Sequence, residues 1–161
     1  MADPRECREE LNELLRAEYD CAGRLGSLLG IETTALHGRD IEAIEALVDR
    51  KQALMQEFDS LETRRQALLE RAGFGGPQPD VDACIAWCDS SGRLARGWRL
   101  LLDRIRDCQH RNRRNGAILE SSRRQAQQAL ALLRGQSPQT DLYNPNGSTA
   151  TDPLGRSLAK A

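Results

Sequence analysis

Apolar residues in the first part of the chain recur at intervals of three and four, or at sums of these intervals. This is the period of an amphipathic helix, in which such residues share one face, and not the alternation of a strand. The pattern predicts a helix over residues 4–36. Its stripe consists of Leu11, Leu15, Ala22, Leu25, Leu29 and Leu36, and Leu14 and Leu28 widen it.

A second helix is predicted up to residue 72, because Asp40 is a favourable N-cap and Gly73 a favourable C-cap. The run Gly75-Gly76-Pro77 prevents its continuation. The link to the first helix is short, so residues 4–72 are expected to form an antiparallel hairpin. The expected stripe is Ile41, Ile44, Val48, Met55, Phe58, Leu61 and Leu68, flanked by Leu47, Leu54 and Leu69.

A short helix is predicted over residues 80–89 and a long helix over residues 91–134. The long helix carries a seam that steps by four and three without interruption, as in a coiled coil. At about 1.5 Å per residue it would span about 65 Å, so it should exceed the hairpin helices and leave part of its seam uncovered. The seam comprises Leu94, Trp98, Leu101, Ile105, Cys108, Asn112, Asn115, Leu119, Ser122, Ala126, Ala129 and Leu133.

These elements predict an all-α fold, an antiparallel three-helix bundle or coiled coil with one short extra helix, in a domain of residues 1–135. Residues 136–161 are rich in Ser, Thr, Asn, Pro and Gly and are expected to be a flexible, mobile C-terminal tail. Within that tail, Leu142 and Tyr143 stand in a turn-forming context, which suggests a docking point for another protein. A tail that folds back on the bundle is the alternative.

The two halves of the seam differ in polarity. Leu94 to Cys108 is expected to be bundle core, whereas Asn112 and Asn115 stand where leucine would be usual. These polar residues would either form layers that fix the register inside the bundle or line a groove for a foreign helix. The pattern does not separate the two interpretations.

Composition favours long helices, because aromatic residues make up only 4% of the chain and charged residues 29%. No apolar run is long enough to span a membrane, and residues 1–10 lack the apolar core of a secretory signal. Five cysteines, an odd number at irregular spacing, fit free and mostly buried thiols in a reducing compartment. We therefore expect a cytoplasmic protein without membrane insertion.

Charge is distributed unevenly along the chain. Residues 1–72 carry 10 Lys and Arg against 16 Asp and Glu, whereas residues 93–134 carry 11 Arg against 3 Asp and Glu. We expect the acidic hairpin to pack beside the basic helix. A nucleic-acid surface is the alternative, but the interleaved aromatics of single-strand binders are missing there apart from Trp98.

No catalytic constellation is evident in the sequence, and no cofactor or metal is expected. His37 lies in a turn and His110 in an Arg-rich stretch. The candidate ligands of a zinc site would be Cys84, Cys88, Cys108 and His110. Structural zinc motifs usually place their cysteines on turns, however, and here they fall on apolar helix faces, where cysteine behaves as a small hydrophobe.

Three segments together resemble the signature of the FlgN proteins. They are Asn112-x-x-Asn115-Gly116-x-x-Leu119, Ala129-Leu130-x-Leu132-Leu133-x-Gly135 and Leu142-Tyr143-x-Pro145-x-Gly147. The resemblance spans essentially the whole chain, and the leucine-rich hairpin with Lys51-x-x-Leu54 fits it. One departure is Asn144, where Gly is frequent in the family, although Asn also tolerates a left-handed turn.

The resemblance implies a cytosolic chaperone of the flagellar type III export system and not an enzyme. FlgN proteins bind the C-terminal helical segments of the hook-filament junction proteins FlgK and FlgL, prevent their early assembly and deliver them to the export gate protein FlhA. The family's C-terminal region binds the client, meaning the protein awaiting export, and Tyr143 matches a tyrosine associated with gate docking.

We therefore expect client binding at Ile118, Leu119, Ala126, Leu130 and Leu133, and export-gate docking at Leu142 and Tyr143. The competing hypothesis is a general coiled-coil adaptor without an export role, which would form a homodimer through the long helix.

Overall fold

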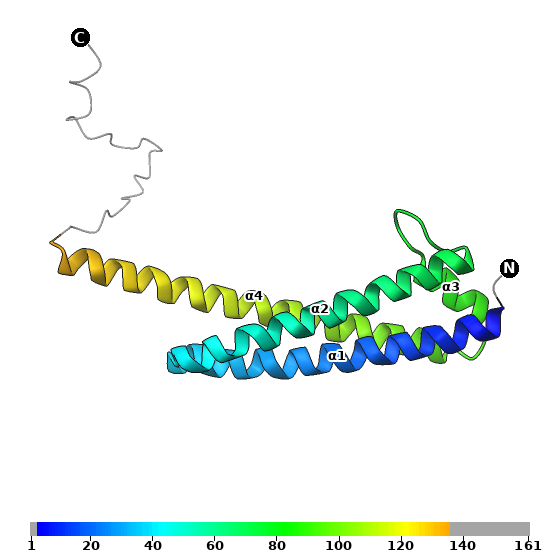
Figure 1. Cartoon of the computed structure of the whole chain (residues 1–161), viewed down its shortest axis with the longest axis horizontal. Coiled ribbons are helices and arrows are strands. Elements are labelled where there is room, and N and C mark those ends of the chain that lie inside the picture. The colour runs from blue at the N-terminus through cyan, green and yellow to red at the C-terminus, as the bar shows by residue number, and fades with distance from the viewer. Residues whose placement is uncertain (1–2, 136–161) are drawn as a thin grey trace, which may run out of the picture. The chain divides into compact units, whose positions relative to one another are not determined.

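The computed structural model describes residues 3–135, which form four α-helices with no strand among them (Figure 1). The helices are α1 (Pro4–Gly38), α2 (Ile41–Ala72), α3 (Val81–Cys88) and α4 (Arg93–Leu133). The predicted all-α class is confirmed, and each predicted helix end lies within two residues of the observed one. The described part of the chain divides into two units, one that ends at residue 122 and one that begins at residue 123, and the helix packing described next belongs to the first unit.

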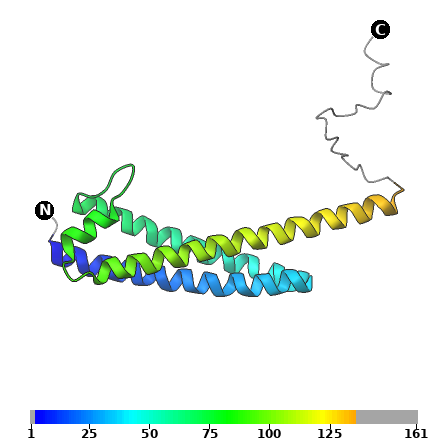
Figure 2. The ribbon, with the colours of Figure 1, turned by 180° about the vertical axis from the view of Figure 1, so that it is seen from behind.

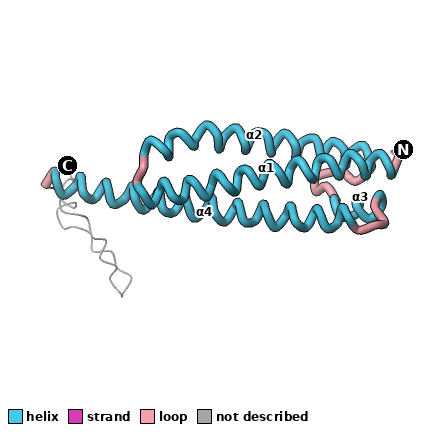
Figure 3. The backbone as a smooth tube through the Cα atoms, turned by 90° about the horizontal axis from the view of Figure 1, so that it is seen from below, coloured by secondary structure: helices cyan, strands magenta, loops and turns pink. Residues whose placement is uncertain are grey.

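Side-chain pairs establish the directions of the helices. Ion pairs between α1 and α2 join rising numbers on one helix to falling numbers on the other, so this hairpin is antiparallel. They are Glu10–Arg71, Glu18–Arg65, Arg24–Glu57 and Glu32–Lys51. Hydrogen bonds between α1 and α4 rise together, at Tyr19–Arg104, Ala22–Cys108 and Leu29–Asn115, so these helices run parallel. Seen from below, α1 is flanked by α2 and α4 (Figure 3).

Local capping residues set the ends of the hairpin helices. Asp40 Oδ1 accepts a hydrogen bond from the backbone N–H of Ala43 at 3.0 Å, as the sequence predicted for an N-cap. Gly73 ends α2 with a φ of 88°, a left-handed conformation that glycine adopts without steric cost. Helix α1 continues to Gly38, beyond the predicted end, and stops where Arg39 takes the left-handed conformation.

Helix α4 begins at Arg93, two residues after its predicted start, and a buried carboxylate, that of Asp89, lies just before it. Asp89 is buried and accepts hydrogen bonds from the hydroxyl of Ser91 at 2.6 Å and from the backbone N–H of Leu94 at 2.9 Å. These bonds, above all the one from Ser91, stabilise the carboxylate and lower the pKa of Asp89 to about 2. Asp89 therefore connects the end of α3 to the first turn of α4.

Helix α3 lies beside the N-terminal end of α1 (Figure 2), and the side chains of both helices are part of the apolar core. All four helices contribute buried side chains to it, among them Leu11, Leu14, Leu61, Leu69, Ile85 and Leu101. The apolar face predicted for the short helix is confirmed, because Val81, Cys84, Ile85 and Cys88 are all buried. Removal of this apolar surface from water is the main force that holds an eight-residue helix in place.

The buried face of α2 differs from the predicted stripe. The pattern places Ile41, Val48 and Met55 on that face, but all three side chains are exposed. The face is centred instead on residues at intervals of seven, namely Leu47, Leu54, Leu61 and Leu68. The predicted stripe combined three heptad positions, and the one that holds Ile41, Val48 and Met55 is buried only at Leu69, near the end of α2.

An ion pair lies inside the bundle. The Nε atom of Arg65 donates to both carboxylate oxygens of Glu18, at 3.0 and 3.1 Å, and its guanidinium lies 5.1 Å from the centre of the Trp98 ring. Burial raises the pKa of the Glu18 carboxyl, and the charge of Arg65 opposes this shift. The three residues join α1, α2 and α4, and a shifted register would leave a buried charge without its partner.

Candidate docking surface

The buried side chains of α4 stand at intervals of seven, at Leu94, Leu101, Cys108 and Asn115. Trp98 and Ile105, at intervening positions of the seam, are half-buried. The first half of the seam is therefore bundle core, as the sequence predicted. The last buried residue of the seam, Asn115, is polar, and its hydrogen bonds show whether it packs inside the bundle or lines a groove.

The side-chain amide of Asn115 joins three helices in one polar layer. Its Nδ2 donates to the carbonyl oxygen of Leu29 at 3.0 Å and to the carboxylate of Glu32 at 2.7 Å, and its Oδ1 accepts from the hydroxyl of Thr33 at 2.7 Å. Glu32 also accepts from Lys51 of α2, at 3.0 and 3.1 Å. A buried amide with this many partners is satisfied, so Asn115 forms a register-fixing layer and does not line an open groove.

The side chain of Asn112, unlike that of Asn115, is exposed. It lies at the edge of a groove of about 230 Å³ that α1, α2 and α4 form together. The apolar lining of this groove comes from Leu25, Leu29, Met55, Phe58 and Ile105. The two asparagines of the seam therefore divide between the two interpretations, one in the core and one at a groove.

Beyond Asn115, none of the residues 116–135 is buried. Of the residues predicted to bind a client, Ile118 is half-buried and Ala126 is exposed, while Leu119, Leu130 and Leu133 are 53%, 51% and 83% exposed. Leu132, which the sequence analysis did not select, is 62% exposed. Its exposure could have been suspected, because it lies outside the heptad seam. Leu119 in the first unit, and Leu130, Leu132 and Leu133 in the second, are thus large apolar side chains left exposed within their own units.

The residues predicted to dock at the export gate, Leu142 and Tyr143, lie outside the described residues. Their role stays a prediction.

Positive charge accompanies the exposed leucines. Arg113 and Arg114 are exposed on α4. Arg104, nearer the core, contacts α1 through Tyr19, with its guanidinium 3.6 Å from the ring centre and a hydrogen bond to the carbonyl oxygen. The interhelical ion pairs named above lie within the hairpin, so they do not neutralise these exposed arginines. A partner segment with acidic residues beside its apolar face would complement this surface.

The cysteines are all free and buried, as predicted. The set considered for zinc does not come together, because Cys108 donates to the carbonyl oxygen of Ala22 while Cys84 lies against Cys7. His110 is exposed. Within residues 3–135, no helix has the length and apolar character needed to cross a membrane.

These features define a class of protein. It is a helical bundle whose longest helix carries exposed apolar side chains beyond Asn115. The comparison with protein families makes this specific, because the family model described as FlgN protein matches residues 1–151. The chain belongs to the FlgN family, as the resemblance of its seam and tail predicted.

Members of this family are chaperones and not enzymes, and membership supports a general role in flagellar export. Comparison with curated proteins and with solved structures gave no match.

Proposed function

We propose that this protein is a cytoplasmic export chaperone that binds the C-terminal helical segments of FlgK and FlgL, prevents their premature assembly and delivers them to the export gate protein FlhA. One observation carries the proposal: the part of α4 that follows Asn115 exposes Leu119, Leu130, Leu132 and Leu133 and has no buried residue up to residue 135. Family membership supplies the flagellar context.

An amphipathic client segment that is unfolded before export would lay its apolar face on these leucines. It would order as it binds, and the entropy lost in ordering keeps the affinity moderate and release feasible. The exposed Arg113 and Arg114 would favour clients with acidic residues beside that face. The proposed client contacts are Ile118, Leu119, Ala126, Leu130 and Leu133.

The binding free energy expected from each contact follows from the exposed area of the side chain. Full burial of a leucine side chain is worth about 1.5–3 kcal/mol, and Leu119 is 53% exposed, so about half of its surface remains to be covered. We expect Leu119→Ser to weaken binding by about 1 kcal/mol, or about fivefold in Kd. The double variant with Leu130→Ser should lose about 2 kcal/mol, since the two positions are separate.

The experiment is a titration of the full chain with a peptide of the C-terminal segment of FlgK, followed by calorimetry. The matched control is Leu100→Ser, which alters a leucine that is 52% exposed on the same helix but lies before Asn115, outside the proposed contacts. The control should bind with an unchanged Kd. Equal weakening by Leu119→Ser and Leu100→Ser, or no binding by the wild type, would contradict the assignment.

Gate docking is proposed to reside in the tail at Leu142 and Tyr143, separately from client binding. Tyr143→Ala should leave the affinity for FlgK unchanged and reduce capture of the chaperone by FlhA. Truncation after Gly135 should likewise leave a folded bundle and impair delivery. A pull-down in which Tyr143→Ala loses FlgK and keeps FlhA would refute the separation.

The coiled-coil adaptor hypothesis draws on the same exposed leucines, because a second copy of α4 would also cover them. Analytical ultracentrifugation with and without the FlgK peptide separates the two functions. A chaperone forms a defined complex with the peptide, whereas an adaptor stays a dimer and does not respond to it.

A further inference from the structure

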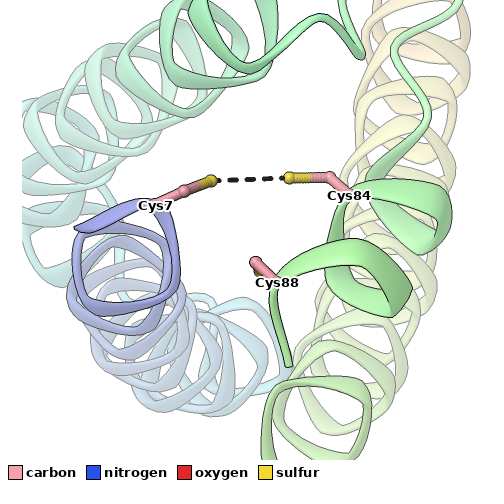
Figure 4. Close-up of side chains that lie close together, drawn as sticks. All are labelled: Cys7, Cys84 and Cys88. Carbon is pink, nitrogen blue, oxygen red and sulfur yellow. Dashed lines mark hydrogen bonds between the residues drawn. The ribbon is translucent and has the colours of Figure 1, made fainter. Parts of the chain in front are cut away.

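Three cysteines from distant parts of the chain converge beside the core. Cys7 lies in the second turn of α1, and Cys84 and Cys88 lie one turn apart on α3 (Figure 4). The three sulfur atoms all lie within 4.8 Å of one another, and those of Cys7 and Cys84 are 3.7 Å apart. All three residues are buried, and Cys88, at 9% exposure, is the nearest to solvent.

The spacing of the sulfurs is that of a metal-thiolate centre. Zinc–sulfur bonds are about 2.3 Å long, and in a tetrahedron this places neighbouring sulfurs about 3.8 Å apart. The separation of Cys7 and Cys84 already has this value, and small side-chain rotations would bring in the third sulfur.

The donor set decides which metal fits. Three thiolates without a nitrogen or oxygen donor favour a soft ion over Mg²⁺ or Ca²⁺. Zn²⁺ would leave the buried centre with one negative charge, whereas a monovalent ion such as Cu⁺ would leave two, and burial of charge is costly. Zinc sites with three protein ligands complete their tetrahedron with a water molecule, and the partial exposure of Cys88 leaves a side open to solvent.

All three cysteines belong to the apolar core cluster. A metal cation supplies the positive charge that the site otherwise lacks, and each thiol would release its proton to solvent as its sulfur–metal bond forms.

We propose that Cys7, Cys84 and Cys88 form a zinc-binding site that fastens α3 to the beginning of α1. This departs from the expectation drawn from the sequence, which considered Cys84 and Cys88 without Cys7. The inference is independent of the proposed chaperone function, because the site lies at the end of the bundle that holds the core and uses none of the exposed leucines.

The test is a titration of the reduced full chain with Co²⁺, followed by displacement with Zn²⁺. Thiolate coordination gives a sulfur-to-cobalt absorption band in the near ultraviolet, which should saturate at one ion per chain and disappear when Zn²⁺ is added. Cys84→Ala should weaken binding at least about tenfold, since even changes outside the ligand shell cost that much. Cys108→Ala is the matched control, because Cys108 is buried but lies outside the cluster.

Zn²⁺ should also raise the Tm of the wild type and of Cys108→Ala, and leave that of Cys84→Ala unchanged. If Cys84→Ala does not fold, as judged by circular dichroism, Cys88→Ser tests the same ligand set at the more exposed position. No saturable binding by the wild type, or unchanged affinity in the cluster variants, would overturn the proposal. So would an intact mass lower by two hydrogens in the protein as isolated, absent in Cys84→Ala, combined with no saturable metal binding after reduction, because the cluster would then be a disulfide pair.

Discussion

Replacement of Asn115 by alanine tests whether the polar layer holds α4 in register. The change removes three hydrogen bonds, to Leu29, Glu32 and Thr33. The groups left behind keep other partners, because Glu32 remains paired with Lys51 and the single proton of the Thr33 hydroxyl, which Asn115 Oδ1 or the Leu29 carbonyl can accept, is then donated to the Leu29 carbonyl at 2.8 Å. The variant therefore loses only the free energy of the hydrogen bonds, because no charged group is left buried without a partner.

The magnitude follows from the character of each bond. A hydrogen bond to a charged group contributes about 1.5–3 kcal/mol and a neutral one about 0.5–1.5 kcal/mol. The carboxylate of Glu32 is shared with Lys51 and its side chain is 15% exposed, so the lower end of each range applies. The Thr33 bond is exchanged for one to Leu29, so the net loss is about 2 kcal/mol. The better helix propensity of alanine offsets about 0.5 kcal/mol. We expect Asn115→Ala to lower the free energy of unfolding by about 1.5 kcal/mol.

The assay is urea denaturation of the full chain, followed by far-ultraviolet circular dichroism. Asn112→Ala is the matched control, because it removes the same side chain from an exposed position of the same seam. It should change the free energy of unfolding by less than about 0.5 kcal/mol. The reasoning fails if the two variants unfold at the same urea concentration, because Asn115 would then contribute no more than a surface residue.

Two further predictions concern buried carboxylates. Glu18→Ala should destabilise the bundle by about 3 kcal/mol, because it leaves Arg65 buried without its partner. Glu18→Gln should cost less, because its amide oxygen still accepts from Nε; equal losses in urea titrations would contradict this. For Asp89, the folded-state pKa of about 2 lies below the usual 3.8, so its stabilising contribution is present above about pH 4 and is lost as the pH falls towards 2. Thermal unfolding between pH 2 and 5 should show this decline in the wild type and a weaker one in Asp89→Asn; parallel curves would refute it.

The sequence predicts the helices well because their determinants are local. The N-cap at Asp40 and the stop at Gly73 each depend on residues within one turn, and both are confirmed. The prediction of the buried face of α2 was wrong for a related reason. Leu47 and Val48 are adjacent and both apolar, so the local pattern does not determine which of the two packs against α1.

The candidate sites depend on partners that are distant in sequence. Asn112 and Asn115 look alike in the seam, and only the placement of Glu32 and Thr33 opposite one of them makes it a buried layer. The cysteine cluster is a stronger example. Cys7 precedes Cys84 by 77 residues, so no spacing rule joins them, and their proximity is a product of α3 packing on α1.

Under the proposed function, the end of burial at Asn115 separates residues that stabilise the fold from residues that bind the client. Leu101 is fully buried, and its truncation to alanine should cost about 2–5 kcal/mol of stability whether or not a client is present. Leu130 is 51% exposed, so its truncation should leave the free protein nearly unchanged and act only on the complex. A bound client raises the apparent stability in proportion to the logarithm of its concentration over Kd. The rise in Tm on adding the FlgK peptide should therefore shrink in Leu130→Ala. In Leu101→Ala, both the free and the bound Tm should fall together.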